Sequence, residues 1–201
     1  VAGSGRELGG AIATDKRIRK ISFTGSVEVG EQICRAAGIK RVTMELGSNS
    51  PVIVMEDADL DRAAELVTAS GYSNAGQVCI SAQRILVSRS VHAAFLERLV
   101  PRVRAISAGD QLDPSTKMGP MIREQDARRV ETWVGEAVSS GARVLAGGER
   151  RGTLHTATLV DNCRPDMRIC RDELFGPALA VMPFDSLEEA IRIANDSAYG
   201  L

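Results

Sequence analysis

The sequence predicts an α/β fold in which a mainly parallel sheet is flanked by helices. Short strand-like apolar runs alternate with longer runs in which apolar residues recur every three or four positions. Residues 84–88 show the strand pattern, and residues 91–106 follow with helical spacing at Phe95, Leu99 and Val103. Strands that alternate with helices form βαβ units, whose strands run parallel.

The same patterns assign the other elements along the chain. A glycine turn at the start leads into a short helix, and further helices are expected over residues 27–37, 60–73, 91–106 and 124–140. Strands are expected over residues 21–23, 41–46, 52–54, 84–88, 143–146, 156–160 and 178–184. Ser186 and Glu189 fit a capping box, in which Ser186 caps a last helix to about residue 195 and Glu189 bonds back. Both chain ends look cut, since neither shows a clear start or stop signal.

Composition and charge exclude several classes of protein. The 201 residues are 44% apolar and 25% charged, which is the balance of a soluble globular protein. The net charge of −1 gives no electrostatic basis for binding nucleic acid or a membrane surface. No apolar run is long enough to span a bilayer, and no signal-peptide pattern opens the chain. We therefore expect a cytoplasmic protein without nucleic-acid or membrane partners.

The four cysteines are interpreted as reduced thiols, because disulfide frameworks belong mostly to small secreted domains. Metal sites usually need close Cys or His pairs. The nearest cysteines are seven residues apart and the two histidines are isolated, so no metal is expected. Cys34 lies on the apolar face of a helical pattern and is expected in the core. Cys163 and Cys170 flank a loop and are expected to have no functional role.

Two glycine-containing segments are candidates for nucleotide binding. In Gly3-Ser4-Gly5-Arg6-Glu7-Leu8-Gly9 the third glycine is one residue late for a dinucleotide fingerprint, and no strand precedes it. In Phe23-Thr24-Gly25-Ser26 a strand runs into a turn before a helix, where N–H groups and the helix dipole favour a phosphate. Glu31 and Gln32 follow Gly30 where a P-loop needs Lys and Ser or Thr. An ordinary helix capped by Ser26 explains the second segment equally well.

Three further segments carry chemistry-bearing residues in a familiar order. Met44-Glu45-Leu46-Gly47 ends a strand with a glutamate, Gly76-Gln77-Val78-Cys79 has a cysteine on a loop, and Asp172-Glu173-Leu174-Phe175-Gly176-Pro177 has a glutamate before a Gly-Pro turn. Together with the turn at Gly25, these segments resemble the NAD(P)-dependent aldehyde dehydrogenases. The resemblance covers essentially the whole chain, and the interval of 34 positions from Glu45 to Cys79 matches the family's spacing.

The resemblance implies the catalytic roles. Cys79 matches the nucleophile, whose thiolate adds to an aldehyde to form a thiohemiacetal and then a thioester. The Cys79 backbone N–H would help to hold the oxyanion. Glu45 matches the base that activates water to hydrolyse the thioester.

The resemblance also implies the cofactor, NAD or NADP, and the residues that would hold it. Gly25, Ser26 and Gly30 match the turn and helix near the adenosine and pyrophosphate, and Val29 would pack by the adenine, with Gly5 beside it. Glu173 would bond the nicotinamide ribose, Phe175 would lie by that ring, and the Leu46 carbonyl would meet the carboxamide. Residues 1–44 would complete a nucleotide-binding domain, and residues 45–201 would form most of the catalytic domain.

Several points stay open from the sequence. Ser48 stands where the family more often has a second glycine, and we expect a slightly altered backbone there without loss of chemistry. Family members are more than twice as long, so the isolated chain is expected to be inactive, and the full-length protein to be a homo-oligomeric dimer or tetramer. The substrate would be a small-molecule aldehyde. Val78 and Ile80 would form an apolar rim that favours a small or uncharged one, and the motifs look closest to the lactaldehyde and semialdehyde branches.

Two alternatives to this function remain. A CoA-acylating semialdehyde dehydrogenase or a phosphate-linked reductase would share the fold, although such enzymes tend to lack a glutamate at the position of Glu45. A non-catalytic aldehyde-dehydrogenase-like protein is the second alternative, against which the presence of both Cys79 and Glu45 argues.

Overall fold

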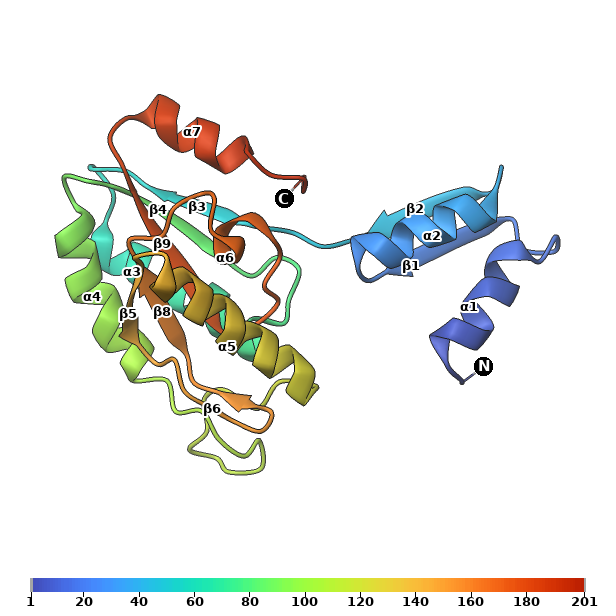
Figure 1. Ribbon diagram of the computed structural model, residues 1–201, viewed down its shortest axis with the longest axis horizontal. Coiled ribbons are helices and arrows are strands. Elements are labelled where there is room, and N and C mark those ends of the chain that lie inside the picture. Colours follow the sequence, from blue (N-terminus) through green and yellow to red (C-terminus); the bar gives the residue numbers. More distant parts are fainter. Residues whose placement is uncertain (1, 201) are drawn as a thin grey trace. The chain divides into compact units, whose positions relative to one another are not determined.

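The computed structural model describes residues 2–200, which divide into a smaller unit ending at Gly47 and a larger unit beginning at Ser48 (Figure 1). The smaller unit contains α1 (Gly5–Thr14), β1 (Lys20–Thr24), α2 (Val27–Ala37) and β2 (Arg41–Glu45). The strands β1 and β2 are parallel, with Thr24 opposite Glu45. The buried core of this unit is small and consists of Ala13, Ile21 and Ala37.

The larger unit is built on a five-stranded sheet. Its elements in chain order are β3 (Pro51–Val54), α3 (Leu60–Tyr72), the 3₁₀ turn η1 (Ser73–Gly76), β4 (Arg84–Ser88), α4 (His92–Arg104), α5 (Glu124–Ser139), β5 (Arg143–Ala146), β6 (Arg150–Arg151), β7 (Leu154–His155), β8 (Thr158–Asp161), α6 (Arg168–Arg171), β9 (Ala178–Phe184) and α7 (Leu187–Asn195). The strand order is β3-β4-β9-β8-β5, and only the β5–β8 pair is antiparallel. The predicted α/β fold with a mainly parallel sheet and flanking helices is confirmed.

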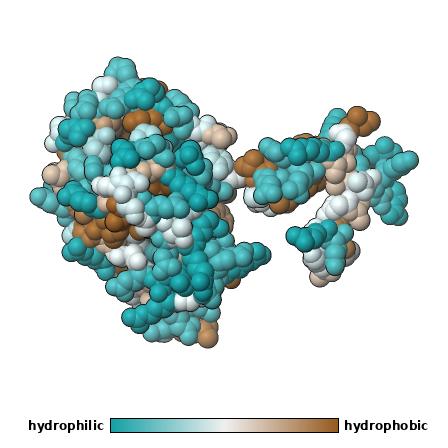
Figure 2. Space-filling model, viewed as in Figure 1, coloured by the Kyte–Doolittle hydropathy of each residue, from teal (hydrophilic) through white to brown (hydrophobic). Residues whose placement is uncertain are grey.

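The hydrophobic core of the larger unit lies between the sheet and its helices. All five residues of β4 are buried, as is expected for a central parallel strand that is covered on both faces. In Figure 1, α3 lies behind the sheet and α5 in front of it. Hydrophilic residues cover most of the face of this unit that Figure 2 shows. The largest fully buried side chains include Phe95, Phe184, Ile85, Leu86, Leu99, Leu159 and Ile169.

Two helices of the larger unit, α3 and α7, begin at residues whose side chains cap them. The Asp59 carboxylate accepts from the Arg62 N–H at 3.0 Å at the start of α3. At α7 the Ser186 hydroxyl accepts from the Glu189 N–H at 3.2 Å, as predicted. The Glu189 carboxylate, however, accepts from the Asp185 N–H at 2.8 Å, so its bond lies one residue earlier than the capping box predicts.

The structure adds three elements that the sequence patterns do not predict. The turn η1 directly continues α3, α6 has four residues, and the β6–β7 hairpin has two residues a side, which are too short to show a period. The strand expected over residues 156–160 begins two residues later, at Thr158, and ends one residue later, on the buried Asp161. This carboxylate is retained in the core because it pairs with His92 at 2.8 Å and Arg143 at 3.0 Å. Within residues 2–200, no helix is long and apolar enough to cross a membrane.

Arg84 is a charged residue at the start of β4, an interior strand of the sheet, and it is 2% exposed. Its guanidinium donates to the carbonyls of Asn49, Ile193 and Ala194 at 2.8–2.9 Å. Burial lowers the pKa of Arg84, but an arginine remains charged at neutral pH. Arg84 thereby ties the last turn of α7 to the segment that precedes β3.

Replacing Arg84 by methionine should lower the free energy of unfolding by about 3 kcal/mol, because three buried carbonyls lose a charged donor. Urea denaturation of the variant measures this loss. The matched control is Arg62→Met, which removes an exposed ion pair with Glu65 and should change stability by at most about 0.5 kcal/mol. Equal effects of the two substitutions would contradict the structural role of Arg84.

His155 is 1% exposed, and its Nδ1 lies 2.9 Å from the Thr156 carbonyl, to which it donates as an N–H. Its Nε2 is buried without a hydrogen-bond partner among the described residues. Burial is the main cause that lowers the pKa of His155 below its usual value. The unfolded chain therefore binds a proton at a higher pH than the folded one does.

The free energy of unfolding should consequently be constant near neutral pH and fall below about pH 6.5, by at most about 1.4 kcal/mol per pH unit for this one group. His155→Phe should reduce that fall, and the Thr156 carbonyl would keep its bond from the Thr158 hydroxyl at 2.8 Å. Urea denaturation between about pH 8 and pH 5 makes the comparison. Identical pH profiles for both proteins would show that His155 is not responsible.

Candidate functional site

Three loops of the larger unit meet because of the sheet topology. The strands β3, β4 and β9 are adjacent and parallel, so the segments that precede them lie at the same edge of the sheet. These segments are residues 48–50, residues 77–83 with Cys79, and residues 172–177 with Glu173 and Phe175. Residues separated by more than 90 positions in the sequence are thereby brought together.

The thiol loop, residues 77–83, follows an unusual stretch of backbone. Asn74, Ala75 and Gly76 all have positive φ, at 50°, 55° and 68°. A Cβ on residue 76 would lie 2.2 Å from the carbonyl oxygen of Gly176, so only glycine permits this close approach. The conformation turns the chain sharply from the end of α3 into the thiol loop.

The Gln77 side chain anchors the beginning of the thiol loop. Its Oε1 accepts from the Ile122 N–H at 3.0 Å, and its Nε2 donates to the Asn74 carbonyl at 3.0 Å. Asn74 returns a bond from Nδ2 to the Gln77 carbonyl at 3.2 Å. The glutamine before the cysteine thus serves to hold the turn.

Cys79 itself is half-buried, so its thiol is neither a core group nor a freely solvated one. The preceding Val78 is half-buried, and the following Ile80 is 68% exposed. The Cys79 carbonyl accepts a hydrogen bond from the Ser48 hydroxyl. The loop is therefore fixed through its backbone while an apolar side chain beside the cysteine faces outward.

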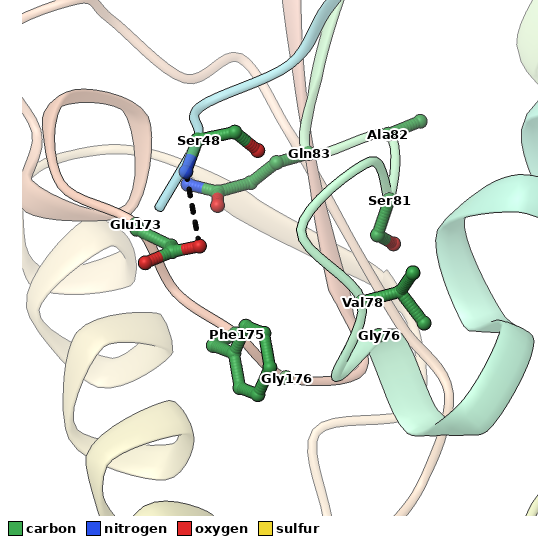
Figure 3. A pocket seen from close by; sticks show the side chains of 9 residues that line it. All are labelled: Ser48, Gly76, Val78, Ser81, Ala82, Gln83, Glu173, Phe175 and Gly176. Atoms are coloured by element: carbon green, nitrogen blue, oxygen red, sulfur yellow. Dashed lines mark hydrogen bonds between the residues drawn. The ribbon is translucent and has the colours of Figure 1, made fainter. Parts of the chain in front are cut away.

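Glu173 and Phe175 lie on the segment before β9. The Glu173 carboxylate is half-buried and accepts from the Ser48 N–H at 3.0 Å, a bond that Figure 3 shows. Phe175 adopts a positive φ of 48° and its ring remains 39% exposed. Left-handed backbone is uncommon for a bulky residue and persists only where its surroundings impose it.

Gln83 supplies much of that constraint. This residue is 7% exposed. Its Nε2 donates to the carbonyls of Ile169 and Asp172 at 2.9 and 2.8 Å, and its Oε1 accepts from the Leu174 N–H at 2.9 Å. The last residue of the thiol loop thus holds the backbone on both sides of Glu173.

A small cavity of about 10 Å³ lies among these loops (Figure 3). Such a volume holds about one water molecule. The cavity is lined by Ser48, Gly76, Val78, Ser81, Ala82, Gln83, Glu173, Phe175 and Gly176. Cys79 and Ile80 are not among these residues, although Val78 and Ser81, which flank them in the thiol loop, are.

The smaller unit contains the other residues that the sequence predicts. Glu45 is exposed at the carboxyl end of β2, and its carbonyl accepts from the Gly25 N–H at 3.0 Å. Ser26 caps α2, with its hydroxyl 3.4 Å from the Val29 N–H. A Cβ on residue 30 would lie 2.6 Å from the Leu46 side chain, so Gly30 allows α2 to approach the end of β2.

A broad groove of about 880 Å³ in the smaller unit involves both helices. Val29 is 41% exposed and lines it, as does Gly5. The structure therefore brings Gly25, Ser26, Val29, Gly30, Glu45 and Leu46 into one unit and Cys79, Glu173 and Phe175 into the other.

The sequence analysis misses the positioning roles of Ser48, Asn49 and Gln83. Asn49 is 1% exposed and donates from Nδ2 to the Cys170 carbonyl at 2.9 Å. The available signal is the position of polar residues directly before apolar strand runs, where backbone groups need partners. That signal does not reveal which distant segment each residue binds.

The other cysteines differ in accessibility. Cys34 is exposed on the described surface, so the expectation that it lies in the core is wrong. The small apolar core of its unit does not extend to the face of α2 that carries it. Cys163 and Cys170 are buried, and the hydrogen bond with Cys170, followed by burial, raises the pKa of Cys163 far above its usual range. The hydrogen bond and burial both disfavour the reactive thiolate at Cys163.

Comparisons with known proteins place this geometry in context. The model of the aldehyde dehydrogenase family matches residues 1–201. A 3-sulfolactaldehyde dehydrogenase of Priestia aryabhattai is 44% identical over 201 residues, covering all of this chain and 42% of that protein. A probable succinate-semialdehyde dehydrogenase [NADP(+)] of Sinorhizobium fredii is 41% identical over 205 residues, again with 100% of this chain and 42% of that protein covered.

The fold agrees with solved structures as well. A crystal structure of betaine aldehyde dehydrogenase from Staphylococcus aureus in complex with NAD+ matches with a TM-score of 0.93 and 36% identity, covering 99% of this chain and 41% of that one. The chain thus spans about two fifths of the length of the relatives it matches. On the family match over its whole length and the agreement of fold, the chain belongs to the aldehyde dehydrogenase family.

Proposed function

We propose that the protein oxidises an aldehyde to a carboxylic acid with NAD or NADP, using Cys79 as the nucleophile. The observation that carries this proposal is the position of Cys79 in a chain matched throughout by the family model. Its thiol is half-buried on a loop fixed by Gln77 and Ser48, next to the segment with Glu173. The buried pair Cys163 and Cys170 offers no comparable access.

The chemistry follows from what a thiolate can do. The Cys79 thiolate adds to the carbonyl carbon of the aldehyde and forms a thiohemiacetal, whose oxyanion the Cys79 N–H would stabilise. Loss of hydride from that adduct leaves a thioester on Cys79. Glu45 would then take a proton from water, which attacks the thioester and releases the acid and the thiol. The assignment of Glu45 rests on its match to the family motif.

NAD or NADP would supply the hydride acceptor when bound. The N-terminus of α2, with Gly25 and Ser26 before it, offers N–H groups to a phosphate. The exposed Val29 side chain in the groove beside it suits an apolar ring face. On the larger unit, the half-buried Glu173 carboxylate can accept from ribose hydroxyls. The Leu46 carbonyl and the Phe175 ring are proposed to meet the nicotinamide end.

The proposed substrate class is a small aldehyde. The apolar Val78 and Ile80 beside the nucleophile favour an aldehyde that is small or uncharged near its reacting end. Two relatives are named for sulfolactaldehyde and succinate semialdehyde, so these compounds and simple aliphatic aldehydes are the first substrates to test. Water is proposed as the final acceptor because Glu45 is present.

The division of roles between the units is part of the same proposal. Residues 1–44 would belong to a nucleotide-binding domain and residues 45–201 to the catalytic domain. Because the chain spans about two fifths of its relatives, we propose that these 201 residues alone have little activity. The complete protein is proposed to act in the cytoplasm as a homo-oligomer, a dimer or tetramer.

In the protein at its natural length, Cys79→Ala should reduce aldehyde-dependent reduction of NAD(P) by at least about 10³-fold, since the covalent step is lost. Glu45→Gln should reduce steady-state turnover by about 10²-fold while a thioester accumulates, which mass spectrometry of the intact protein detects. Cys34→Ser is the matched thiol control and should retain full activity. Formation of acyl-CoA in place of the free acid would identify a CoA-acylating enzyme, and normal activity of Cys79→Ala would overturn the proposal.

Thiol labelling tests accessibility without any need for turnover. In the folded chain, iodoacetamide should modify Cys34 and Cys79 at least about 10²-fold faster than Cys163 and Cys170, which are buried. Peptide mass spectrometry assigns each site, and Cys34→Ser leaves Cys79 as the only fast thiol. Labelling of Cys163 at the rate of Cys79 would contradict the structure, whereas uniform rates after unfolding in urea are the expected control.

A further inference from the structure

Ser48 lies between the two segments that carry Glu173 and Cys79. Its backbone N–H donates to Glu173 Oε1 at 3.0 Å, and its side-chain hydroxyl donates to the Cys79 carbonyl. Figure 3 shows Ser48 above Glu173 at the edge of the cavity. One residue therefore contacts both segments, and it does so through two different groups that can be removed separately.

Ser48 is itself rigidly held. It is 4% exposed, and its Oγ lies 3.2 Å from Ser50 Oγ. Because the single Ser48 hydroxyl proton is directed to the Cys79 carbonyl, Ser50 acts as the donor in that contact. The Ser50 carbonyl in turn accepts from the backbone N–H groups of Gln83 and Arg84 at 3.1 and 3.2 Å. Ser48 therefore belongs to a segment whose backbone is bonded to Gln83 and to Arg84, the first residue of β4.

The backbone around Cys79 has few other restraints. The Ser81 N–H donates to the Val78 carbonyl at 2.9 Å, which closes a turn with Cys79 and Ile80 at its centre. Ile80 is 68% exposed and contributes little packing. Among the described residues, Ser48 is the only donor to the Cys79 carbonyl. Without this bond the peptide between Cys79 and Ile80 is restrained only by the Ser81–Val78 bond that closes the turn.

We propose that Ser48 is a positioning residue for the nucleophile: its hydroxyl fixes the peptide that follows Cys79, while its N–H independently orients the Glu173 carboxylate. This inference rests on the proposed function of Cys79. Holding the carbonyl restricts rotation about the Cα–C bond of Cys79 and so limits the directions in which its Cα–Cβ bond can point relative to the loop. Loss of the hydroxyl should therefore slow the step at Cys79 and leave the contribution of Glu173 to cofactor binding unchanged.

The test compares wild type, Ser48→Ala and Ser48→Thr in the protein at its natural length. Ser48→Ala should lower kcat by about three- to tenfold, the worth of one hydrogen bond, with KM for NAD(P) within about twofold of wild type. Hydrogen exchange of the Ser81 amide, which reports on the turn around Cys79, should accelerate by about the same factor. Ser48→Thr retains a hydroxyl and should restore both quantities. The matched control is Ser140→Ala, which removes a hydroxyl bond to the Glu136 carbonyl at 2.9 Å and should change neither.

Each outcome decides the matter. If Ser48→Ala leaves kcat and Ser81 exchange within about twofold of wild type, the inference is overturned. A rise in KM for NAD(P) with unchanged kcat would also overturn it, because the effect would then act through Glu173. If the wild-type protein oxidises no aldehyde, the proposed function fails. The exchange measurement still tests whether the Ser48 hydroxyl restrains the turn around Cys79. Should Ser48→Thr be too crowded to fold, the exchange and kinetics of Ser48→Ala remain decisive.

Discussion

Gln83 holds the three loops of the larger unit together, because its side chain bonds to the segment before β9 and its backbone N–H donates to the Ser50 carbonyl. Both amide protons and the carbonyl oxygen are used, and all three partners are backbone groups of residues 169–174. A buried amide with all these groups paired contributes to stability and, more importantly, specifies one arrangement, because any alternative leaves polar groups unpaired in the core. The neighbouring Arg84 points to the opposite side of the strand, as the two-residue period requires, and binds the end of α7.

The sheet topology determines which ends of the strands carry the candidate site residues. In the larger unit, β3, β4 and β9 are adjacent and parallel, so Ser48, Cys79 and Glu173 all precede the amino ends of neighbouring strands. In the smaller unit, Gly25 follows β1 and Glu45 is the last residue of β2, so both lie at the carboxyl ends of the strands. Open parallel sheets usually bind ligands at the carboxyl ends of their strands. The smaller unit follows that rule, and the larger unit presents its candidate site residues at the other end.

The sequence predicts elements better than it predicts contacts. The ranges Val27–Ala37, Arg84–Ser88, Arg143–Ala146 and Ala178–Phe184 agree with the structure residue for residue, because apolar period and turn residues are local signals. The roles of Ser48 and Gln83 are not local. Ser48 bonds to a carboxylate 125 positions away and Gln83 to a backbone N–H 91 positions away, and the sequence does not show which distant group a polar residue will bind. For Cys34 a local pattern gave a wrong prediction. Its position on an apolar helix face predicted burial, but the small core of its unit leaves Cys34 exposed.

The carboxylate of Glu173 is able to serve Ser48 and a ligand at the same time. An ionised carboxylate offers about four acceptor positions on its two oxygens. The bond from the Ser48 N–H occupies one position on Oε1, and the side chain remains half-buried at the edge of the cavity. Hydroxyl donors can therefore reach the remaining positions without displacing Ser48. In the proposed function, a cofactor ribose would then meet a carboxylate whose orientation is already set. The free-energy cost of ordering that side chain would therefore not weaken cofactor binding.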